Sequence, residues 1–288
     1  MSKIFTRSYR ARYSDINADG QLAPSETLRY VIETAYDWAE NLGLGYQASE
    51  KLGFVWVIRE TEMHFFESLH FRDEFDFTIW LLEWRRVRGT RAFVVTHKDH
   101  GITIAQGVQQ IACLDTNTQR PVSPPEEFIQ KFLPDAPQAV PSQPFPKISA
   151  LPDSSLTLQQ KVAWQDLDVM DIVNNAVYIA YAEEAVTQML AYFGWSPMEL
   201  KSHGLARKVR RLHIQYHTPA RWGDTLNLTI TSLQLDPIGS SQYVGMTRAS
   251  DGAPIASCIL DWSLTDRGNG EALALPESLS TALKATLR

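Results

Sequence analysis

Residues 164–178 read WQDLDVMDIVNNAVY, and residues 13–27 read YSDINADGQLAPSET. The two stretches align without a gap at an offset of 151 positions, the distance from Asp15 to Asp166, and the same offset sets Asn17 against Asp168. The offset also pairs identical residues along most of the chain: Tyr30 with Tyr181, Glu33 with Glu184, Gly43 with Gly194, Arg59 with Arg210, Asp73 with Asp224, Thr78 with Thr229, Ile79 with Ile230, Gly101 with Gly252, Ile104-Ala105 with Ile255-Ala256, and Pro125-Glu126 with Pro276-Glu277. Chance matches would not keep one register over that span, so the sequence predicts two copies of one structural unit.

The chain length agrees with a duplication, because a single hydrophobic core stops growing near about 250–300 residues and this chain has 288. A proline-rich stretch separates the copies, with Pro134, Pro137, Pro141, Pro144, Pro146 and Pro152. Proline fixes φ and lacks a backbone donor, so this stretch is expected to be an extended linker. We place the units at residues 1–133 and 154–288, with the linker at 134–153.

Both copies predict the same order of elements. A short strand leads into a turn that holds Asp15 or Asp168, and a helix follows in which apolar residues recur every three or four positions. Gly43 and Gly194 are placed to end the two helices. The apolar helix faces are Leu28, Val31, Ile32, Ala35, Trp38 and Leu42 in the first copy, and Tyr178, Tyr181, Ala182, Ala185, Val186, Met189 and Phe193 in the second.

Alternating apolar residues predict strands around each helix. The expected strands are Arg7–Tyr13, Glu62–Phe66, Glu74–Glu83, Ala92–Lys98 and Gln106–Asp115, then Leu156–Trp164, His213–His217, Thr225–Leu235, Gln242–Ala249 and Ala256–Leu264. A long apolar helix beside an antiparallel sheet of this kind is an α+β unit in which the sheet wraps the helix.

Composition narrows the class of protein. With 44% apolar and 21% charged residues, the chain has the balance of a globular protein. The 27 basic and 33 acidic residues give a net charge of −6, so no global basic field attracts nucleic acid. No uncharged run reaches the ~20 residues of a membrane helix, so no membrane insertion is expected. Two cysteines, and an N-terminal stretch without an apolar signal run, predict a reducing, cytoplasmic setting.

The stretch from Asp166 to Tyr178 resembles the Asp-x-Asp … Val-Asn-Asn-x-x-Tyr signature of the hotdog-fold thioesterases. The duplicated chain with its proline-rich linker is similar to the acyl-ACP thioesterases, which carry two hotdog units. The resemblance implies two tandem hotdog units, each an antiparallel sheet wrapped around a long central helix, packed as a pseudo-dimer. It also implies an acyl carrier protein or coenzyme A thioester as partner and no cofactor, and it leaves room for a homodimer of tandem chains.

The chain departs from the acyl-ACP pattern at several positions. Those thioesterases usually have Asp-x-Asn-x-His where this chain has Asp168, Met170 and Ile172. They also carry a Glu-Cys pair on the next strand, where an ungapped reading gives Pro219 and Ala220. The hydroxybenzoyl-CoA thioesterase branch reads Asp-x-Asp-x-x-Gly-Ile-Val and lacks that histidine, and this chain is closer to that version. Of the side chains in the acyl-ACP pattern, this chain therefore keeps one acidic residue, Asp168.

Hydrolysis of a thioester needs a group that delivers water or attacks the carbonyl, together with donors for the developing oxyanion. Asp168, in the turn before the second helix, is predicted to be the general base or the nucleophile. The free N–H groups at the helix start, around Asn174 and Asn175, are predicted to polarise the carbonyl. The structural alternative is that Asp166 or Asp168 caps the turn and the two asparagine side chains cap the helix.

The first copy carries Asn17 at the position of Asp168, and an amide is no base at neutral pH. Ala23-Pro24 replaces the two asparagines. This copy is expected to be non-catalytic and to supply the wall of an acyl pocket, with Asn17 among the substrate-binding residues. A base at Asp15 or Asp19 is the alternative.

His213, Gln215 and His217 alternate along one predicted strand and should therefore face the same way. The functional interpretation is that Gln215 or His217 positions water at the substrate. The alternative is an ordinary set of hydrogen-bonded sheet residues. Two histidines four apart suit a metal on a helix but not on a strand, and no third ligand is evident, so no metal is expected.

Two basic clusters stand out against the acidic total. Both fall where strands should emerge from their unit, and a basic rim suits either the phosphates of coenzyme A or an acidic carrier protein. A solvated hairpin surface is the alternative. The clusters are Arg85, Arg86, Arg88 and Arg91, and Arg207, Lys208, Arg210 and Arg211.

Cys113 and Cys258 lie in apolar strands and are expected to be inert. The sequence has no P-loop, no Gly-rich dinucleotide turn and no Gly-x-Ser-x-Gly elbow, which argues against kinase, dehydrogenase and serine-hydrolase activities.

The leading hypothesis is hydrolysis of fatty acyl thioesters in lipid metabolism, such as fatty acid biosynthesis. The alternative is a non-catalytic acyl-thioester-binding or scaffold protein. A hotdog dehydratase is less supported, because Ile172 stands where that chemistry uses a histidine.

Overall fold

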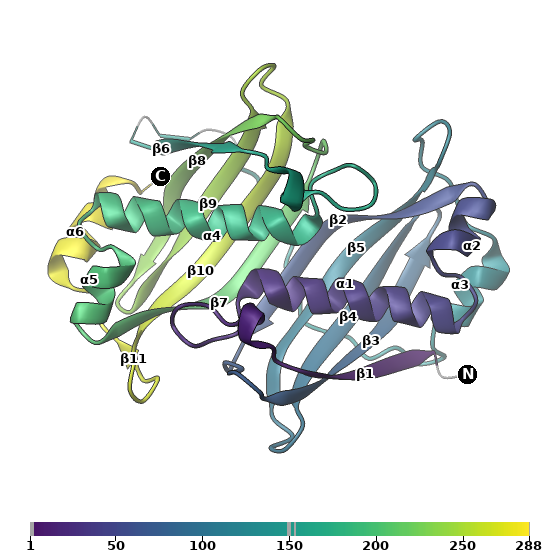
Figure 1. Ribbon diagram of the computed structural model, residues 1–288, viewed down its shortest axis with the longest axis horizontal. Helices are drawn as coiled ribbons and strands as arrows, with labels where there is room; N and C mark the ends of the chain where they lie inside the picture. Colours follow the sequence, from purple (N-terminus) through teal and green to yellow (C-terminus); the bar gives the residue numbers. More distant parts are fainter. Residues whose placement is uncertain (1–2, 149–150, 153, 288) are drawn as a thin grey trace. The chain divides into compact units, whose positions relative to one another are not determined.

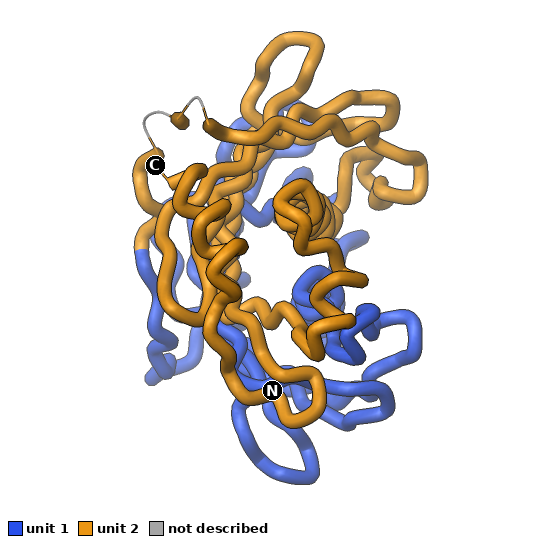
Figure 2. Tube along the Cα trace, turned by 90° about the vertical axis from the view of Figure 1, so that its left-hand side faces the viewer, with its two compact units in different colours: residues 1–143 blue, residues 144–288 orange. Residues whose placement is uncertain are grey.

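The computed structural model describes residues 3–148, 151–152 and 154–287. The chain divides into two compact units, residues 1–143 and 144–288, which Figure 2 shows in blue and orange. Within the described residues, no helix combines the length and the apolar character that crossing a membrane requires.

Unit 1 is an antiparallel sheet with one long helix across a face (Figure 1). The strands lie in the order β1-β3-β4-β5-β2, so the first strand pairs with the third and the second closes the other end. The elements are β1 (Ile4–Arg10), η1 (Tyr13–Asp15), α1 (Pro24–Asn41), α2 (Tyr46–Lys51), β2 (Phe54–Phe65), β3 (Glu74–Arg85), β4 (Arg88–His97), β5 (Thr103–Asp115) and α3 (Glu126–Phe132).

Unit 2 repeats this architecture. Its strands lie in the order β6-β8-β9-β10-β7, with the short β11 paired to β10, and α4 contacts β6, β8, β9 and β10. The elements are β6 (Leu156–Lys161), η2 (Trp164–Asp166), α4 (Asn175–Tyr192), α5 (Pro197–Ser202), β7 (Leu205–Tyr216), β8 (Thr225–Asp236), β9 (Gly239–Arg248), β10 (Pro254–Asp266), β11 (Ala272–Leu273) and α6 (Glu277–Ala285). The predicted α+β class, with a long helix against an antiparallel sheet in each copy, is confirmed.

The duplication extends to individual hydrogen bonds. The hydroxyls of Thr6 and Thr78 lie 2.9 Å apart on the paired strands β1 and β3. At the equivalent place in unit 2, the hydroxyls of Thr157 and Thr229 lie 3.2 Å apart on β6 and β8. Identical cross-strand registers therefore underlie the offset seen in the sequence.

Irregularities of the backbone recur at the same offset. The register of β2 against β5 shifts between Ile58 and Glu60, so Arg59 is the extra residue. The register of β7 against β10 shifts in the same way around Arg210. A β-bulge twists a strand and re-aims its side chains, so its presence in both copies is a feature of the shared architecture.

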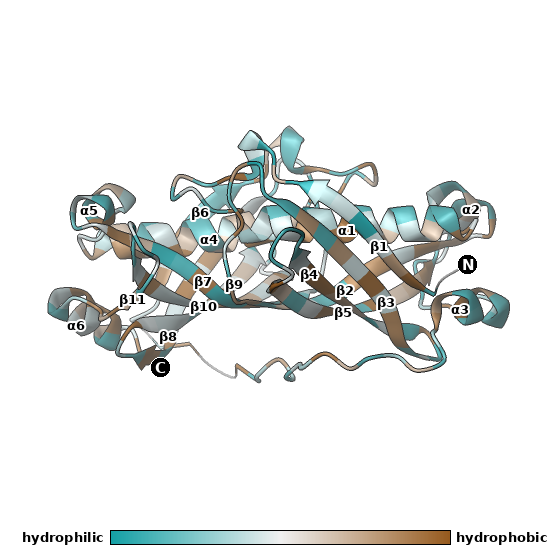
Figure 3. Ribbon diagram, turned by 90° about the horizontal axis from the view of Figure 1, so that it is seen from below, coloured by the Kyte–Doolittle hydropathy of each residue, from teal (hydrophilic) through white to brown (hydrophobic). Residues whose placement is uncertain are grey.

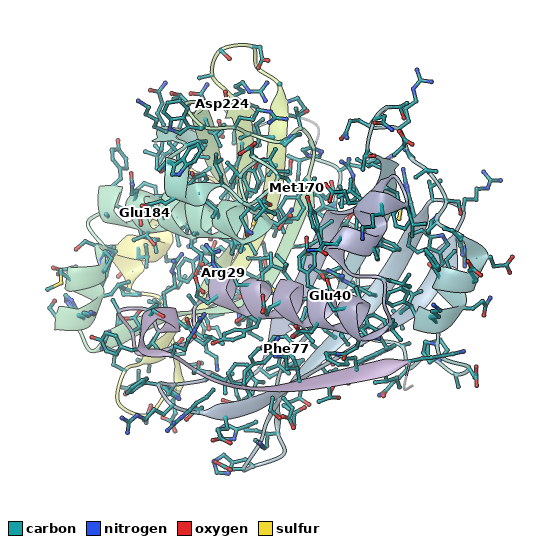
Figure 4. All side chains as sticks on the ribbon, turned by 45° about the vertical axis from the view of Figure 1, so that its right-hand side comes forward. Arg29, Glu40, Phe77, Met170, Glu184 and Asp224 are labelled. Atoms are coloured by element: carbon teal, nitrogen blue, oxygen red, sulfur yellow. The ribbon has the colours of Figure 1, made fainter. Side chains whose placement is uncertain are left out.

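The core of each unit lies between the long helix and the sheet. In unit 1, Leu28 and Val31 of α1 are fully buried, and the rings of Tyr30 and Phe77 stack with centroids 6.2 Å apart; Figure 4 labels Phe77 on the sheet near α1. In unit 2, Ile179 and Val186 of α4 are fully buried. The long apolar stretches of the strands, brown in Figure 3, match this burial.

Several element boundaries differ from the sequence predictions. β2 and β7 begin at Phe54 and Leu205, several residues before the predicted starts. The first half of β2 is a short apolar run whose periodicity does not separate strand from helix, and the first half of β7 is interrupted by Arg207, Lys208 and Arg210, which break the alternation of apolar residues. β6 ends at Lys161, and the predicted strand end at Trp164 is instead the 3₁₀ turn η2. The short helices α2, α3, α5 and α6 were not predicted from the pattern.

Part of the proline-rich stretch packs on unit 1. Val140 is buried with Trp80, Ala92 and Val108, on the opposite side of the sheet from Phe93. The indole N–H of Trp80 donates to the carbonyl of Gln138 at 2.9 Å. Residues 134–143 of the predicted linker accordingly belong to the compact unit that ends at residue 143.

Candidate active site

Asp168 lies in a tight loop that precedes α4. A bridge between Leu167 and Val173 closes the loop, and the Asp168 N–H donates to the carbonyl of Ile172 at 2.9 Å. The Asp168 carboxylate accepts the N–H of Met170 at 2.9 Å. Within this loop Asp171 adopts a left-handed conformation with φ of 57°. The side chain of Asp168 thus helps to shape the loop that carries it.

The equivalent loop of unit 1 has the same construction. The Asn17 N–H donates to the carbonyl of Gln21 at 2.8 Å, and the Asn17 side-chain oxygen accepts the N–H groups of Asp19 at 2.9 Å and Gln21 at 3.1 Å. Gly20 takes the left-handed position of Asp171, with φ of 81°. An amide therefore satisfies the geometry of this turn, so the turn does not require the charge of Asp168.

The environment of Asp168 differs from that of Asn17. Asp168 is half-buried, whereas Asn17 is exposed. Burial raises the pKa of the Asp168 carboxyl, with a further contribution from the charge of Asp171, and hydrogen bonds from the N–H groups of Met170 and Ile172 oppose the increase. A carboxylate whose pKa is raised toward neutrality is a better proton acceptor than an exposed one.

The start of α4 lies a few residues after this loop. The Asn174 side chain caps the helix by accepting the Ala176 N–H at 3.0 Å, and the Asn174 N–H donates to the carbonyl of Asp166 at 2.9 Å. Asn175 is the first helical residue, and an N–H of the first turn has no carbonyl within its helix to bind. Of the two asparagines, Asn175 therefore has the backbone donor better suited to an oxyanion, at the positive end of the helix dipole.

Asp166 has a structural role. Its carboxylate accepts the N–H of Ala163 at 2.7 Å and the hydroxyl of Tyr181 at 2.5 Å. In unit 1, the hydroxyl of Tyr30 donates to Asp15 in the same way. The first aspartate of each repeat ties its 3₁₀ turn to the helix that follows.

Tyr178 and Ala220 join the loop to the rest of unit 2, and sequence reasoning missed this connection. The Ala220 N–H donates to the Tyr178 hydroxyl at 2.9 Å, and the Val173 N–H donates to the Ala220 carbonyl at 3.0 Å. Burial raises the pKa of Tyr178 to about 12, and the negative charges of Asp168 and Asp224 contribute. The sequence signals were Tyr178 as a member of the apolar helix face and of the Val-Asn-Asn-x-x-Tyr stretch, and neither indicated its contact with Ala220.

The segment before β8 therefore lies against the Asp168 loop, as the family pattern implies. It carries Pro219 and Ala220 in place of a Glu-Cys pair, so it supplies backbone groups to the loop. Arg221 adds a hydrogen bond from its Nη1 to the Asp171 carbonyl at 3.3 Å. Met170 and Asp224, which mark the loop and this segment, are labelled in Figure 4.

The alternating polar residues of β7 occupy different surroundings. His213 is fully buried, and its ring lies 4.9 Å from that of Phe145. Gln215 is half-buried opposite Ser257 of β10, and His217 follows the strand with its Nε2 3.2 Å from the Ser257 hydroxyl. Their proposed role in positioning water stays a prediction.

The second basic cluster lies within β7 rather than at its exposed end. Arg207 donates to the Thr187 hydroxyl at 3.1 Å, Arg210 pairs with Asp236 at 2.7 Å, and Arg211 pairs with Asp261 at 3.3 Å. Lys208 is half-buried in the same strand, as are the three arginines. A role of these four residues in binding an acyl carrier stays a prediction.

Neither cysteine has the surroundings of a nucleophile. Cys113 and Cys258 are fully buried, and burial raises the pKa of both thiols. In the described part of the chain, no group of three or more His, Cys, Asp or Glu residues is arranged to hold a metal ion.

The chain belongs to the thioesterase-like superfamily, whose family model matches residues 11–132 and again residues 162–283. It is 22% identical over 276 residues to the chloroplastic acyl-(acyl-carrier-protein) hydrolase FATB3 of Cuphea viscosissima, an alignment that covers 92% of this chain and 63% of that relative. The chain thus spans under two thirds of that protein's length. A stretch of 133 residues is 29% identical to the long-chain acyl-CoA thioesterase FadM of Escherichia coli, an alignment that covers 45% of this chain and 98% of FadM.

Two solved structures share the tandem architecture. A putative oleoyl thioesterase from Lactobacillus plantarum superposes with a TM-score of 0.77 at 15% identity, over 95% of this chain and 97% of that one. The 12:0-ACP thioesterase from Umbellularia californica gives a TM-score of 0.75 at 19% identity, over 92% and 99%. These structural likenesses confirm the fold predicted from the sequence, two tandem hotdog units. The repeated match of the family model and the similarity to FATB3 confirm the resemblance to the acyl-ACP thioesterases.

Proposed function

We propose that this protein is a thioesterase that hydrolyses fatty acyl thioesters, carried on acyl carrier protein or coenzyme A, to the free acid. The observation that carries the proposal is Asp168: a half-buried carboxylate with a raised pKa, held next to the first turn of α4 in a thioesterase-like unit. Its equivalent in unit 1 is the uncharged Asn17. Unit 2 is then the catalytic copy, and unit 1 supplies the acyl pocket with Asn17 near the substrate.

In the proposed reaction Asp168 acts as general base. It takes a proton from water, the hydroxide attacks the thioester carbonyl, and the Asn175 N–H stabilises the oxyanion of the tetrahedral intermediate. Collapse of the intermediate breaks the C–S bond, and the proton on Asp168 passes to the leaving thiolate. Direct attack by the Asp168 carboxylate, giving an anhydride that water then hydrolyses, is the alternative role for the same residue.

The names of the relatives support both carriers. FATB3 is an acyl-(acyl-carrier-protein) hydrolase, and FadM is a long-chain acyl-CoA thioesterase. We propose two groups of substrate-binding residues. They are the half-buried Arg207, Lys208, Arg210 and Arg211, and the polar Asn174, Gln215 and His217. A preference for acyl carrier protein would place the protein in fatty acid biosynthesis in the cytoplasm.

The test is hydrolysis of matched acyl-CoA and acyl-ACP panels by the full chain and by Asp168→Asn. The variant is expected to lose about 10²–10⁴-fold in rate, the usual contribution of a general base. The control is Asp19→Asn, which removes a carboxylate from the corresponding loop of unit 1 and should leave the rate unchanged. Full activity of Asp168→Asn would refute the mechanism, and loss of activity in Asp19→Asn alone would move the base to unit 1.

A second candidate is an acyl-thioester-binding or scaffold protein without turnover. It is favoured by the turn contact that Asp168 shares with Asn17, and by the absence of acidic and thiol side chains at Pro219 and Ala220. Tight binding of acyl carriers with no release of free thiol would support it, whereas measurable release would rule it out.

A further inference from the structure

Arg91 points into unit 1, on the sheet face that α1 covers. It lies two positions before Phe93 in β4, and side chains two apart on a strand share a face. The Phe93 ring lies 6.2 Å from that of Phe77, which stacks on Tyr30 of α1. Tyr36 of α1 also contributes to the charge environment of Arg91. Arg91 therefore differs from Arg85, Arg86 and Arg88, the exposed arginines of the β3–β4 hairpin with which the sequence grouped it.

Arg91 begins a row of three polar residues across adjacent strands. It pairs in register with Gln109 of β5, which pairs with Thr61 of β2. The Arg91 Nε donates to the Gln109 side-chain oxygen at 2.7 Å, and the Gln109 amide donates to the Thr61 hydroxyl at 3.0 Å. Gln109 and Thr61 are fully buried. We call these three residues the Arg91 row.

The charge of this row lacks a counterion. Within residues 3–148 and the other described segments, no acidic side chain forms an ion pair with Arg91, and the Gln109 amide is its hydrogen-bond partner. Burial lowers the pKa of Arg91 to about 10, so the group is still cationic at neutral pH. Arg91 is half-buried, and partial removal of a cation from water without an anion is unfavourable. Its two Nη groups present the fork that binds a carboxylate through two hydrogen bonds.

The architecture does not itself require this cation. The 151-residue offset places Gln242, Leu260 and Leu212 of unit 2 at the positions of Arg91, Gln109 and Thr61. These three residues pair in the same register across β9, β10 and β7. Unit 2 therefore forms the same sheet with two leucines and one neutral amide, which makes the charged row a specific property of unit 1.

Aromatic rings flank the row on the same face. A Cβ atom on Gly89 would come within 2.3 Å of the Trp84 ring, and one on Gly107 within 2.5 Å of the Phe93 ring, so each ring covers a glycine of the sheet. Trp84 and Phe93 lie on either side of Arg91 along β3 and β4. A cationic fork between aromatic rings complements a ligand with an anionic head on an apolar chain.

We propose that the Arg91 row binds the carboxylate of an aliphatic carboxylic acid within unit 1. Two kinds of ligand carry such a carboxylate. One is a free fatty acid, and the other is an acyl chain with a second carboxyl group at its far end. Binding of a free acid does not depend on the proposed hydrolysis, so the two conclusions are tested separately.

The first experiment measures binding of hexadecanoate and hexadecanol to the full chain by calorimetry. Hexadecanoate is expected to bind at least tenfold more tightly than the neutral alcohol. Arg91→Gln places in unit 1 the residue that unit 2 has at this position, and it should abolish the preference. The matched control is Arg88→Gln, which removes an exposed charge from the same strand and should retain it. Arg91→Lys keeps the charge without the fork and should give an intermediate preference.

The second experiment separates the two sources by comparing the mono-thioester of hexadecanedioic acid with the hexadecanoyl thioester. Faster hydrolysis of the dicarboxylic substrate that disappears in Arg91→Gln identifies the substrate's own far carboxylate. An effect confined to the free acid identifies the fatty acid as ligand. Equal binding of acid and alcohol by the wild-type chain, or an unchanged preference in folded Arg91→Gln and Arg91→Lys, would overturn the proposal, whether or not hydrolysis is observed.

Discussion

Asp168 and Asn17 hold the same turn with the same backbone contacts, yet only one of them can carry a charge. The oxygen of either side chain accepts an N–H two residues further along the chain. What distinguishes them is burial: Asp168 is half-buried and Asn17 is exposed. The two side chains therefore share a structural role in the turn, and the fold does not need the charge that Asp168 carries.

Asp168→Asn is expected to keep or increase stability at neutral pH. Burial raises the pKa of Asp168 in the folded state, so ionisation of this carboxyl at neutral pH lowers the free energy of unfolding. This penalty disappears below the pKa of the carboxyl in the unfolded state, about 4. The variant should therefore gain up to about 1 kcal/mol at pH 7, a gain that shrinks as the pH falls. Urea denaturation between pH 4 and pH 8 measures this difference.

The control for this prediction is the reverse change in unit 1. Asn17 is exposed, so Asn17→Asp should alter the free energy of unfolding by no more than about 0.5 kcal/mol. A clear loss of stability in Asp168→Asn at pH 7 would show instead that the charge of Asp168 stabilises the fold.

At the scale of elements, a single contact between an aspartate and a tyrosine fixes how each long helix leaves its turn. The Asp166 carboxylate joins η2 to α4 through Tyr181, and Asp15 joins η1 to α1 through Tyr30. These hydrogen bonds to charged acceptors set the direction of the helix start, and with it the position of the Asn175 N–H.

Tyr181→Phe is expected to destabilise the protein by about 1.5–3 kcal/mol, because a partly buried carboxylate loses a hydrogen-bond donor. Tyr30→Phe should cost less, since Arg12 also donates to Asp15. The matched control is Tyr192→Phe, which removes a hydroxyl from an exposed tyrosine of α4 and should change stability by under about 0.5 kcal/mol. Chemical denaturation checks all three, and equal effects of Tyr181→Phe and Tyr192→Phe would contradict the prediction.

The order of strands and long helices was predictable because each signal is local. The three- and four-residue spacing identified α1 and α4, and Gly43 and Gly194 follow them with φ of 72° and 84°. The early start of β2 was missed because a continuous apolar run carries no periodicity, and that of β7 because basic residues interrupt its apolar alternation. The turn at Trp164–Asp166 was missed because the hydroxyl of Tyr181 stabilises it from fifteen residues away.

At the scale of the whole molecule, two copies of one unit have diverged in chemistry while keeping their registers and bulges. Unit 2 has a half-buried carboxylate in its turn, and unit 1 has a half-buried guanidinium in its sheet. The first part of the proline-rich stretch has become part of unit 1 through Val140.

Val140→Ala is expected to destabilise unit 1 by about 1–3 kcal/mol, because it removes buried methyl groups that contact Trp80, Ala92 and Val108. The control is Ala139→Ser at the neighbouring exposed position, for which little change is expected. Thermal unfolding followed by tryptophan fluorescence, to which Trp80 contributes as one of eight tryptophans, measures the unfolding midpoints. Identical midpoints for the two variants would show that this segment does not contribute to the stability of unit 1.

The sequence by itself determined the duplication, the α+β class, the thioesterase resemblance and the contrast between Asp168 and Asn17. Each of these depends on residue identity at a fixed spacing, which is visible along the chain. Only the tertiary structure decided that Ala220 meets Tyr178 across 42 positions, and that Arg91 points beneath α1 instead of joining the exposed hairpin arginines. Those contacts depend on strand register, because a shift of one residue would turn Arg91 to the opposite face of the sheet.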